Sequence, residues 1–121
     1  MRIAGVICEY NPLHNGHIRQ LAETRRIVPD TDAVVCVMSG NAVQRGELAV
    51  FSKHARAHAA VLCGVDLVLE LPLPYVLSSA ERFALGGVRA LNSLNLPGVL
   101  SFGSEAGDLA PLQQLAELLL D

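Results

Sequence analysis

The sequence lacks a strong excess of charge of either sign. Its 121 residues include 9 basic and 12 acidic side chains, which gives a formal net charge of −3. Sequence-independent binding to nucleic acid needs a broad positive surface, and this composition excludes one. Any contact with RNA must therefore rest on a local feature of the chain.

Long apolar runs and closely spaced cysteines are also missing. The first apolar run, Ile3–Cys8, is too short for the core of a signal sequence or for a membrane span. The three cysteines, Cys8, Cys36 and Cys63, form no C-x-x-C pair, which argues against a metal site built on them. Each lies in or beside an apolar run, so we expect buried, reduced thiols in a cytoplasmic protein without membrane contact.

Apolar residues are abundant. They make up 51% of the chain, the mean hydropathy is +0.38, and only 17% of the residues are charged. This composition predicts one globular domain over residues 1–121 rather than a disordered chain. The apolar content is high for so short a chain, so we expect part of the surface to be covered by a neighbour, with self-association as one route.

Apolar runs alternate with helical patterns along the chain. Strands are predicted over Ile3–Cys8, Asp32–Met38, Val65–Leu71 and Val99–Phe102. Helices are predicted over Gly16–Ile27, Lys53–Cys63 with Ser52 as N-cap, Tyr75–Leu94, and Ala110–Leu120. This order predicts an α/β fold, a Rossmann-like parallel sheet of about four strands with helices on both faces. Ligands of such sheets bind beyond the carboxyl ends of the strands, where the unusual loops of this chain fall.

The stretch "EYNPLHNGH", residues 9–17, interrupts the apolar pattern directly after the first strand. Pro12 ends the strand because it cannot donate to a sheet ladder, and His14 and His17 then flank a helix start at Gly16. Amides of a first helical turn attract phosphate, Gly16 lets it approach, and imidazoles can donate to its oxygens. The stretch could alternatively be structural or hold part of a metal site, but phosphate binding fits the residues best.

His14-Asn15-Gly16-His17 after a strand resembles the H-x-G-H signature of the HIGH-type nucleotidyltransferase superfamily. The fuller segment resembles that of the bacterial tRNA(Met) cytidine acetate ligases, which carry Phe where this chain has Leu13. Four later blocks resemble this family in the same order: "MSGNAVQRGE", "GVDLVLELPLPY", "SSAERFALGGV" and "SFGSE". The resemblance covers the whole chain.

The resemblance implies that ATP and acetate form acetyl-adenylate, which acetylates N4 of the wobble cytidine of elongator tRNA(Met). His14 and His17 take the catalytic role of holding phosphates. The resemblance implies these ATP contacts: Ile7, Cys8, Glu9, Tyr10, Asn11, Pro12, Leu13, His14, Asn15, Gly16, His17, Ile18, Arg19, Gln20 and Gly103. Mg²⁺ fits as a companion of ATP, although the sequence identifies no protein ligand for it and no metal site.

The loop after the second strand offers candidate contacts for acetate or phosphate, namely Asn41, Gln44, Arg45 and Lys53. The alternative is a solvated loop in which Arg45 pairs with Glu47. Ala42 and Leu48 depart from the aromatic and the proline that are usual in the family. The following charged residues, Lys53, His54, Arg56 and His58, are interpreted as a solvated helix face.

The resemblance also implies a second phosphate loop after a fifth strand, which this chain does not contain. We therefore expect the nucleotidyltransferase-like domain of residues 1–121 to be incomplete at its C-terminus and inactive alone. Two rival interpretations stay open. One is a different adenylyltransferase of the same superfamily, and the other is a non-catalytic nucleotide-binding module.

Overall fold

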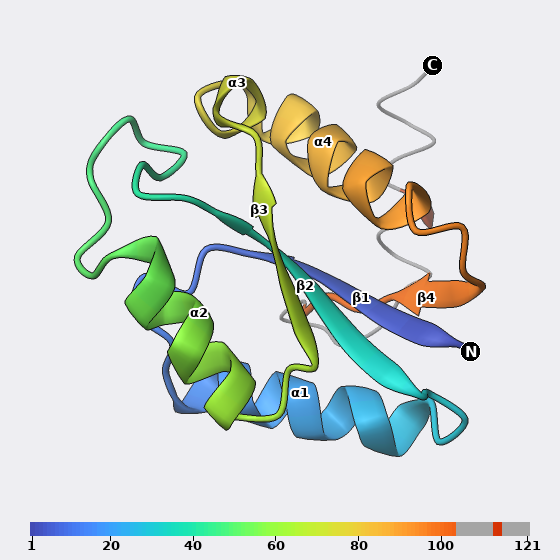
Figure 1. Cartoon of the computed structure of the whole chain (residues 1–121). Coiled ribbons are helices and arrows are strands. Elements are labelled where there is room, and N and C mark those ends of the chain that lie inside the picture. Colours follow the sequence, from blue (N-terminus) through green and yellow to red (C-terminus); the bar gives the residue numbers. More distant parts are fainter. Residues whose placement is uncertain (104–112, 115–121) are drawn as a thin grey trace.

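The computed structural model describes residues 1–103 and 113–114 (Figure 1). Four strands, β1 (Ile3–Cys8), β2 (Ala33–Ser39), β3 (Leu67–Leu71) and β4 (Gly98–Leu100), form one sheet in the order β3-β2-β1-β4. All pairings are parallel, with Ile3 opposite Ala33 and opposite Gly98, and Val35 opposite Leu67. The predicted parallel α/β sheet is confirmed, and its strand bounds shift by one or two residues.

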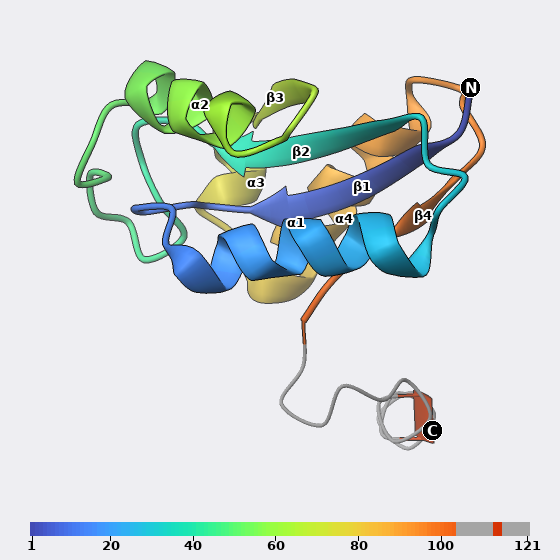
Figure 2. The same cartoon turned by 90° about the horizontal axis from the view of Figure 1, so that it is seen from below.

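Helices cover both faces of this sheet, as Figures 1 and 2 show. One face carries α1 (Asn15–Ile27) and α2 (Lys53–Leu62), and the other carries α3 (Leu73–Val76) and α4 (Ala80–Asn92). Alternate residues of β2 serve the two layers, because successive strand side chains point to opposite faces. Cys36 packs toward α1 and α2, and Val37 packs toward α3 and α4. Both cores are buried, which fixes the register of the central strands.

The continuous helix predicted over Tyr75–Leu94 is wrong, because the chain forms α3 and α4 with a break between them. Two serines make the break. Ser78 Oγ donates to the carbonyl of Pro74, and Ser79 Oγ accepts from the N–H of Arg82 at 3.3 Å as the N-cap of α4. These side chains satisfy backbone groups that a continuous helix would bond internally, and a new helix therefore begins at Ala80.

The glycine pair of α4 allows close packing. A Cβ at Gly86 would collide with the ring of Tyr75, and a Cβ at Gly87 would collide with Ile7 of β1. The helix expected over Ala110–Leu120 lies outside the described residues except for Gln113 and Gln114, which are helical.

Candidate functional site

The parallel sheet brings the ends of β1, β2 and β3 to one edge, where the β1–α1 and β2–α2 loops lie (Figure 1). The β1–α1 loop turns sharply. Tyr10 has a φ of 47°, and the peptide bond between Asn11 and Pro12 is cis. The Tyr10 ring is only 2% exposed, and its hydroxyl lies 3.6 Å from Cys36 Sγ. Burial raises the pKa of Tyr10, so its hydroxyl stays protonated. Tyr10 therefore anchors the loop to the core.

His14 and His17 form a stacked pair at the start of α1. His14 is the N-cap, and its Nδ1 accepts from the N–H of Gly16 at 3.1 Å. Its own N–H donates to Nδ1 of His17, also at 3.1 Å. The ring centroids are 3.7 Å apart with planes inclined by 20°. The prediction that the two histidines flank the helix start is confirmed.

These bonds fix which nitrogen of each ring carries the proton. A ring nitrogen that accepts a backbone N–H has no proton of its own, so both neutral imidazoles carry theirs on Nε2. Burial, and next the proximity of His14, lowers the pKa of His17, which keeps its ring neutral near pH 7. The pair therefore offers two Nε2–H donors on neighbouring parallel rings.

The amides of the first turn are less free than the sequence suggests. The Gly16 N–H bonds to the His14 ring, while the N–H groups of His17 and Ile18 both point to the carbonyl of His14. The glycine serves this ring contact, since a Cβ at Gly16 would lie 2.9 Å from Cε1 of His14. The expectation that these amides are open to phosphate is thus corrected, because the N–H groups of Gly16, His17 and Ile18 all bond to His14. The imidazoles become the main donors.

Long-range hydrogen bonds tie the β2–α2 loop to the β1–α1 loop. Glu9 Oε2 accepts from the N–H of Gln44 at 2.9 Å, and Asn11 Oδ1 accepts from the N–H of Val50 at 2.8 Å. Asn41 Oδ1 accepts from the N–H of Lys53 at 2.8 Å and so caps the start of α2. The side-chain oxygen of Asn41 therefore already has a structural partner. Arg45 lies on the exposed part of this loop, and the ion pairs found among the described residues do not join it to Glu47.

Arg56 is not part of a solvated face, which corrects the interpretation of the charged residues of α2. Its side chain is 2% exposed, and its Nη1 and Nη2 both donate to the carbonyls of Ser39 and Gly40 at 2.8 to 3.1 Å. Those carbonyls end β2 and begin the loop. At the end of β2, the guanidinium thus supplies the hydrogen-bond donors that a neighbouring strand would supply within the sheet. Helical spacing alone gave no sign of this, because the acceptors lie 16 and 17 residues away.

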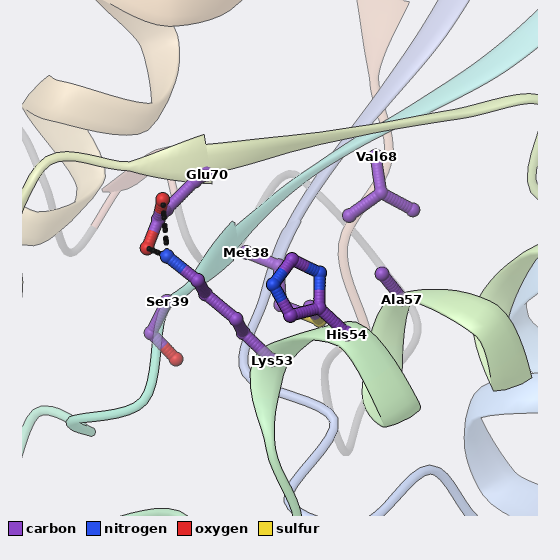
Figure 3. A pocket seen from close by; sticks show the side chains of 7 residues that line it. All are labelled: Met38, Ser39, Lys53, His54, Ala57, Val68 and Glu70. Carbon is purple, nitrogen blue, oxygen red and sulfur yellow. Dashed lines mark hydrogen bonds and ion pairs between the residues drawn. The ribbon is translucent and has the colours of Figure 1, made fainter.

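Lys53 and Glu70 form an ion pair between the start of α2 and the end of β3, with the Lys53 ammonium 3.0 and 3.1 Å from the two carboxylate oxygens (Figure 3). Sequence reasoning missed Glu70. The available signal was a single acidic residue inside the otherwise apolar strand "LVLEL". The pair borders a pocket of about 200 Å³ between α2 and the β2–β3 part of the sheet.

The predicted ATP contacts form one continuous segment of three parts and one separate residue, Gly103. Ile7 and Cys8 end β1, residues 9–14 form the loop, and residues 15–20 form the first half of α1. Gly103 follows β4, the strand beside β1, and a Cβ there would meet open space. Ile7 packs against the α3–α4 core, so its side chain belongs to that face. No contact in the structure tests these ligand roles.

The cysteines are all free thiols. Cys36 is buried as expected, whereas Cys8 and Cys63 are half-buried. A hydrogen bond with Cys36, together with burial, raises the pKa of Cys8 and keeps this thiol protonated. Among the described residues, no three or more His, Cys, Asp or Glu side chains gather as a metal site. None of the helices within that same part of the chain is long and apolar enough to cross a membrane.

Comparison with known proteins places this geometry in a family. The model of the HIGH nucleotidyl transferase family matches residues 1–121. The tRNA(Met) cytidine acetate ligase of Clostridium acetobutylicum is 51% identical over the whole chain, and that of Acetivibrio thermocellus is 49% identical. The chain spans about 30% of the length of these relatives. The motif resemblance to such ligases is therefore confirmed.

Solved structures give the same result. The crystal structure of Thermotoga maritima TmcAL bound with alpha-thio ATP is 45% identical and has a TM-score of 0.91, covering 98% of this chain and 28% of that one. A lipopolysaccharide core biosynthesis protein from Thermoplasma volcanium, 17% identical with a TM-score of 0.52, shares the fold alone. With its H-N-G-H cap on the first helix of a parallel sheet, the chain belongs to the HIGH nucleotidyl transferase family.

Proposed function

We propose that this chain supplies the ATP site of a tRNA(Met) cytidine acetate ligase. The observation that carries the proposal is the His14–His17 pair, whose Nδ1 atoms are both occupied by backbone N–H groups. This arrangement directs two Nε2–H donors toward a ligand without any further rearrangement. The identity of 49 to 51% with ligases of that name, and of 45% with a structure bound to an ATP analogue, supports ATP as the ligand.

The proposed reaction joins the acetate and the tRNA(Met) cytidine that the relatives' name gives, with ATP as the activating substrate. An oxygen of acetate attacks the α-phosphorus of ATP, the bond to the β-phosphate oxygen breaks, and pyrophosphate leaves. N4 of the wobble cytidine of elongator tRNA(Met) then attacks the acetyl carbon, AMP leaves, and N4 loses a proton. His14 and His17 stabilise the charge that develops on the phosphates, which preorganised donors do without a covalent intermediate.

The remaining contacts are part of the same proposal. In this proposal ATP would lie along residues 7–20 and against Gly103, and acetate would be bound from the β2–α2 loop. Mg²⁺ would accompany ATP and supply positive charge to its phosphates, with no ligand from this chain identified. Asn41, Gln44, Arg45 and Lys53 stay the candidates for acetate or phosphate. The backbone of Gln44 and the side chain of Asn41 are engaged in holding the loop. Arg45 is therefore the strongest anion candidate of the four.

Isothermal titration calorimetry with ATP tests the histidine role. His17→Gln can place an amide N–H near the position of the histidine Nε2. His17→Asn can replace only the Nδ1 atom that accepts from the N–H of His14. We expect His17→Asn to weaken ATP binding about 10- to 100-fold, the usual cost of one hydrogen bond to a charged group. His17→Gln should weaken it less.

The matched control is His58→Ala, since His58 is an exposed histidine of α2. It should bind ATP like the unchanged chain. Equal affinity in His17→Asn and the unchanged chain would remove the histidines from the proposed role. Circular dichroism of each variant reports whether the cap at α1 has been lost.

Exchange of labelled pyrophosphate into ATP separates this function from its two rivals. A ligase gives exchange that depends on acetate when this chain replaces the matching segment of a full-length relative. An adenylyltransferase of another kind gives exchange that depends on a phosphorylated precursor. A binding module gives ATP binding and no exchange in either case.

A further inference from the structure

The pocket beside α2 does not include His14 or His17, the two residues proposed to hold phosphates. Its floor is apolar and consists of Met38, Ala57 and Val68, while Ser39, Lys53, His54 and Glu70 supply polar groups (Figure 3). It lies next to the ATP segment, because Met38 is directly opposite Cys8 in the β1–β2 register. A ligand in this pocket would therefore lie one strand away from the segment that carries His14 and His17.

The polar rim of the pocket places an acceptor, Glu70, beside a donor, Lys53, and the charges of the two side chains cancel. Lys53 bonds both carboxylate oxygens of Glu70, and the two side chains are 34% and 52% exposed. The ammonium has three N–H groups, so one remains for a ligand, and the carboxylate keeps further lone pairs. Free acetate would be repelled by Glu70 and a cation by Lys53. A neutral ligand with adjoining donor and acceptor atoms suits the pair best.

One further observation concerns Glu70. Gly40 lets Glu70 lie close to the backbone, since a Cβ there would collide with the carboxylate. The acidic side chain is thus held against the rim of the pocket.

We propose that this pocket binds the cytosine base that accepts the acetyl group, with Glu70 accepting from its exocyclic amine and Lys53 donating to ring N3. This inference rests on the proposed function, because the substrate is taken from it. A carboxylate is a known partner for cytosine N4. Uracil offers the opposite pattern, an acceptor O4 and a donor N3–H, and does not match this placement of the two side chains. Bases in single-stranded loops are splayed out and stack on side chains such as histidine, a role that His54 can fill.

Adenine is the rival occupant, since its N6 amine and N1 present the same donor and acceptor edge. The pocket lies on the β2–β3 side of the sheet, whereas the predicted nucleotide contact Gly103 follows β4 at the opposite side of β1. An ATP molecule that contacts both the histidines and Gly103 extends away from the pocket. This placement favours cytosine, and the experiment treats adenine as an outcome.

NMR titration of the ¹⁵N-labelled chain tests the proposal, because it detects weak binding residue by residue. The probes are a heptauridylate, the same RNA with one central cytidine, and AMP. We expect the cytidine RNA to shift the amide signals of His54, Ala57 and Val68, and the other two probes to leave them in place. Glu70→Gln and Lys53→Met should each weaken the cytidine effect at least fivefold. The control Glu81→Gln, at an exposed position of α4, should leave it unchanged.

Equal shifts from both RNAs, shifts of the same amides by AMP, or full binding by Glu70→Gln would each overturn the proposal. An ATP titration of the same sample, followed at the amides of residues 14–17, separates it from the proposed function. Normal ATP binding without a cytidine effect overturns only the cytosine pocket. A cytidine effect without ATP binding supports the cytosine pocket and overturns the proposal that His14 and His17 hold the phosphates of ATP.

Discussion

The β1–α1 and β2–α2 loops lie side by side, yet they are built in different ways. The histidine pair of the first loop is shaped by hydrogen bonds between residues two and three positions apart. The second loop is held by bonds from Arg56, Glu9 and Asn11, which span 16 to 39 positions. A locally built site should survive changes elsewhere in the fold, whereas the second loop should depend on distant partners.

Removing the Arg56 guanidinium, which holds the second loop, should cause the largest loss of stability. Arg56→Leu leaves the buried carbonyls of Ser39 and Gly40 without their donors. We expect a loss of about 2–4 kcal/mol in the free energy of unfolding, since each unsatisfied buried group costs about 1–3 kcal/mol. Urea denaturation measures the loss. A change below about 0.5 kcal/mol, typical of an exposed residue, would contradict the buried role.

Glu9→Gln should loosen the link between the two loops at a smaller cost. The carboxylate accepts from the N–H of Gln44, and a charged acceptor is stronger than the neutral amide that replaces it. We expect about 1 kcal/mol of destabilisation. Hydrogen exchange at Gln44 should accelerate, while exchange at Gly16 should not change. Faster exchange at both residues would mean that the first loop is not independent.

Gly16→Ala tests the local site alone. The added methyl group would press against Cε1 of His14 and tilt the ring away from its stack with His17. We expect ATP affinity to fall about 3- to 10-fold, up to about 1.4 kcal/mol. Stability should stay nearly constant, since alanine also favours the helix. Calorimetry and thermal denaturation of the same sample check both parts. Unchanged affinity would show that the stack does not matter.

The pH dependence of stability should be the smallest effect. The folded chain holds the pKa of His17 below its ordinary value of 6.5, mainly through burial. The unfolded chain therefore binds this proton first as the pH falls below 6.5, and the contribution of neutral His17 is lost between that pH and its folded pKa. The melting temperature should fall less steeply from pH 7 to pH 5 in His17→Asn than in the unchanged chain. Parallel curves would contradict this assignment.

Much of the fold could be predicted from the sequence because its signals are local. The apolar run at Ile3–Cys8 forms β1 within the predicted bounds, and Ser52 caps α2 as expected. The error at Ser78 and Ser79 shows the limit of apolar spacing. Leucines and alanines continue past these serines, so the pattern predicts one helix, whereas hydroxyl groups decide where a helix begins.

The candidate site divides in the same way. The spacing of His14, Gly16 and His17 predicted that two histidines flank a helix start, because all three residues belong to one helical turn. The direction of the two Nδ1 atoms could not be predicted, and it leaves Nε2 of each ring as the donor that the proposed function uses. Glu70 and Arg56 were missed or misplaced, since their partners Lys53, Ser39 and Gly40 come from other elements.

The sequence by itself determined the parallel sheet, its helix-covered faces and the position of two histidines at a helix start, because apolar runs, helix periodicity and proline or glycine signals act over a few neighbouring residues. Only the tertiary structure decided that Arg56 is buried, that Glu70 meets Lys53, and that the two loops are tied through Glu9. Those contacts join residues from separate elements. Their energies depend on burial and distance, which exist only after the sheet has assembled.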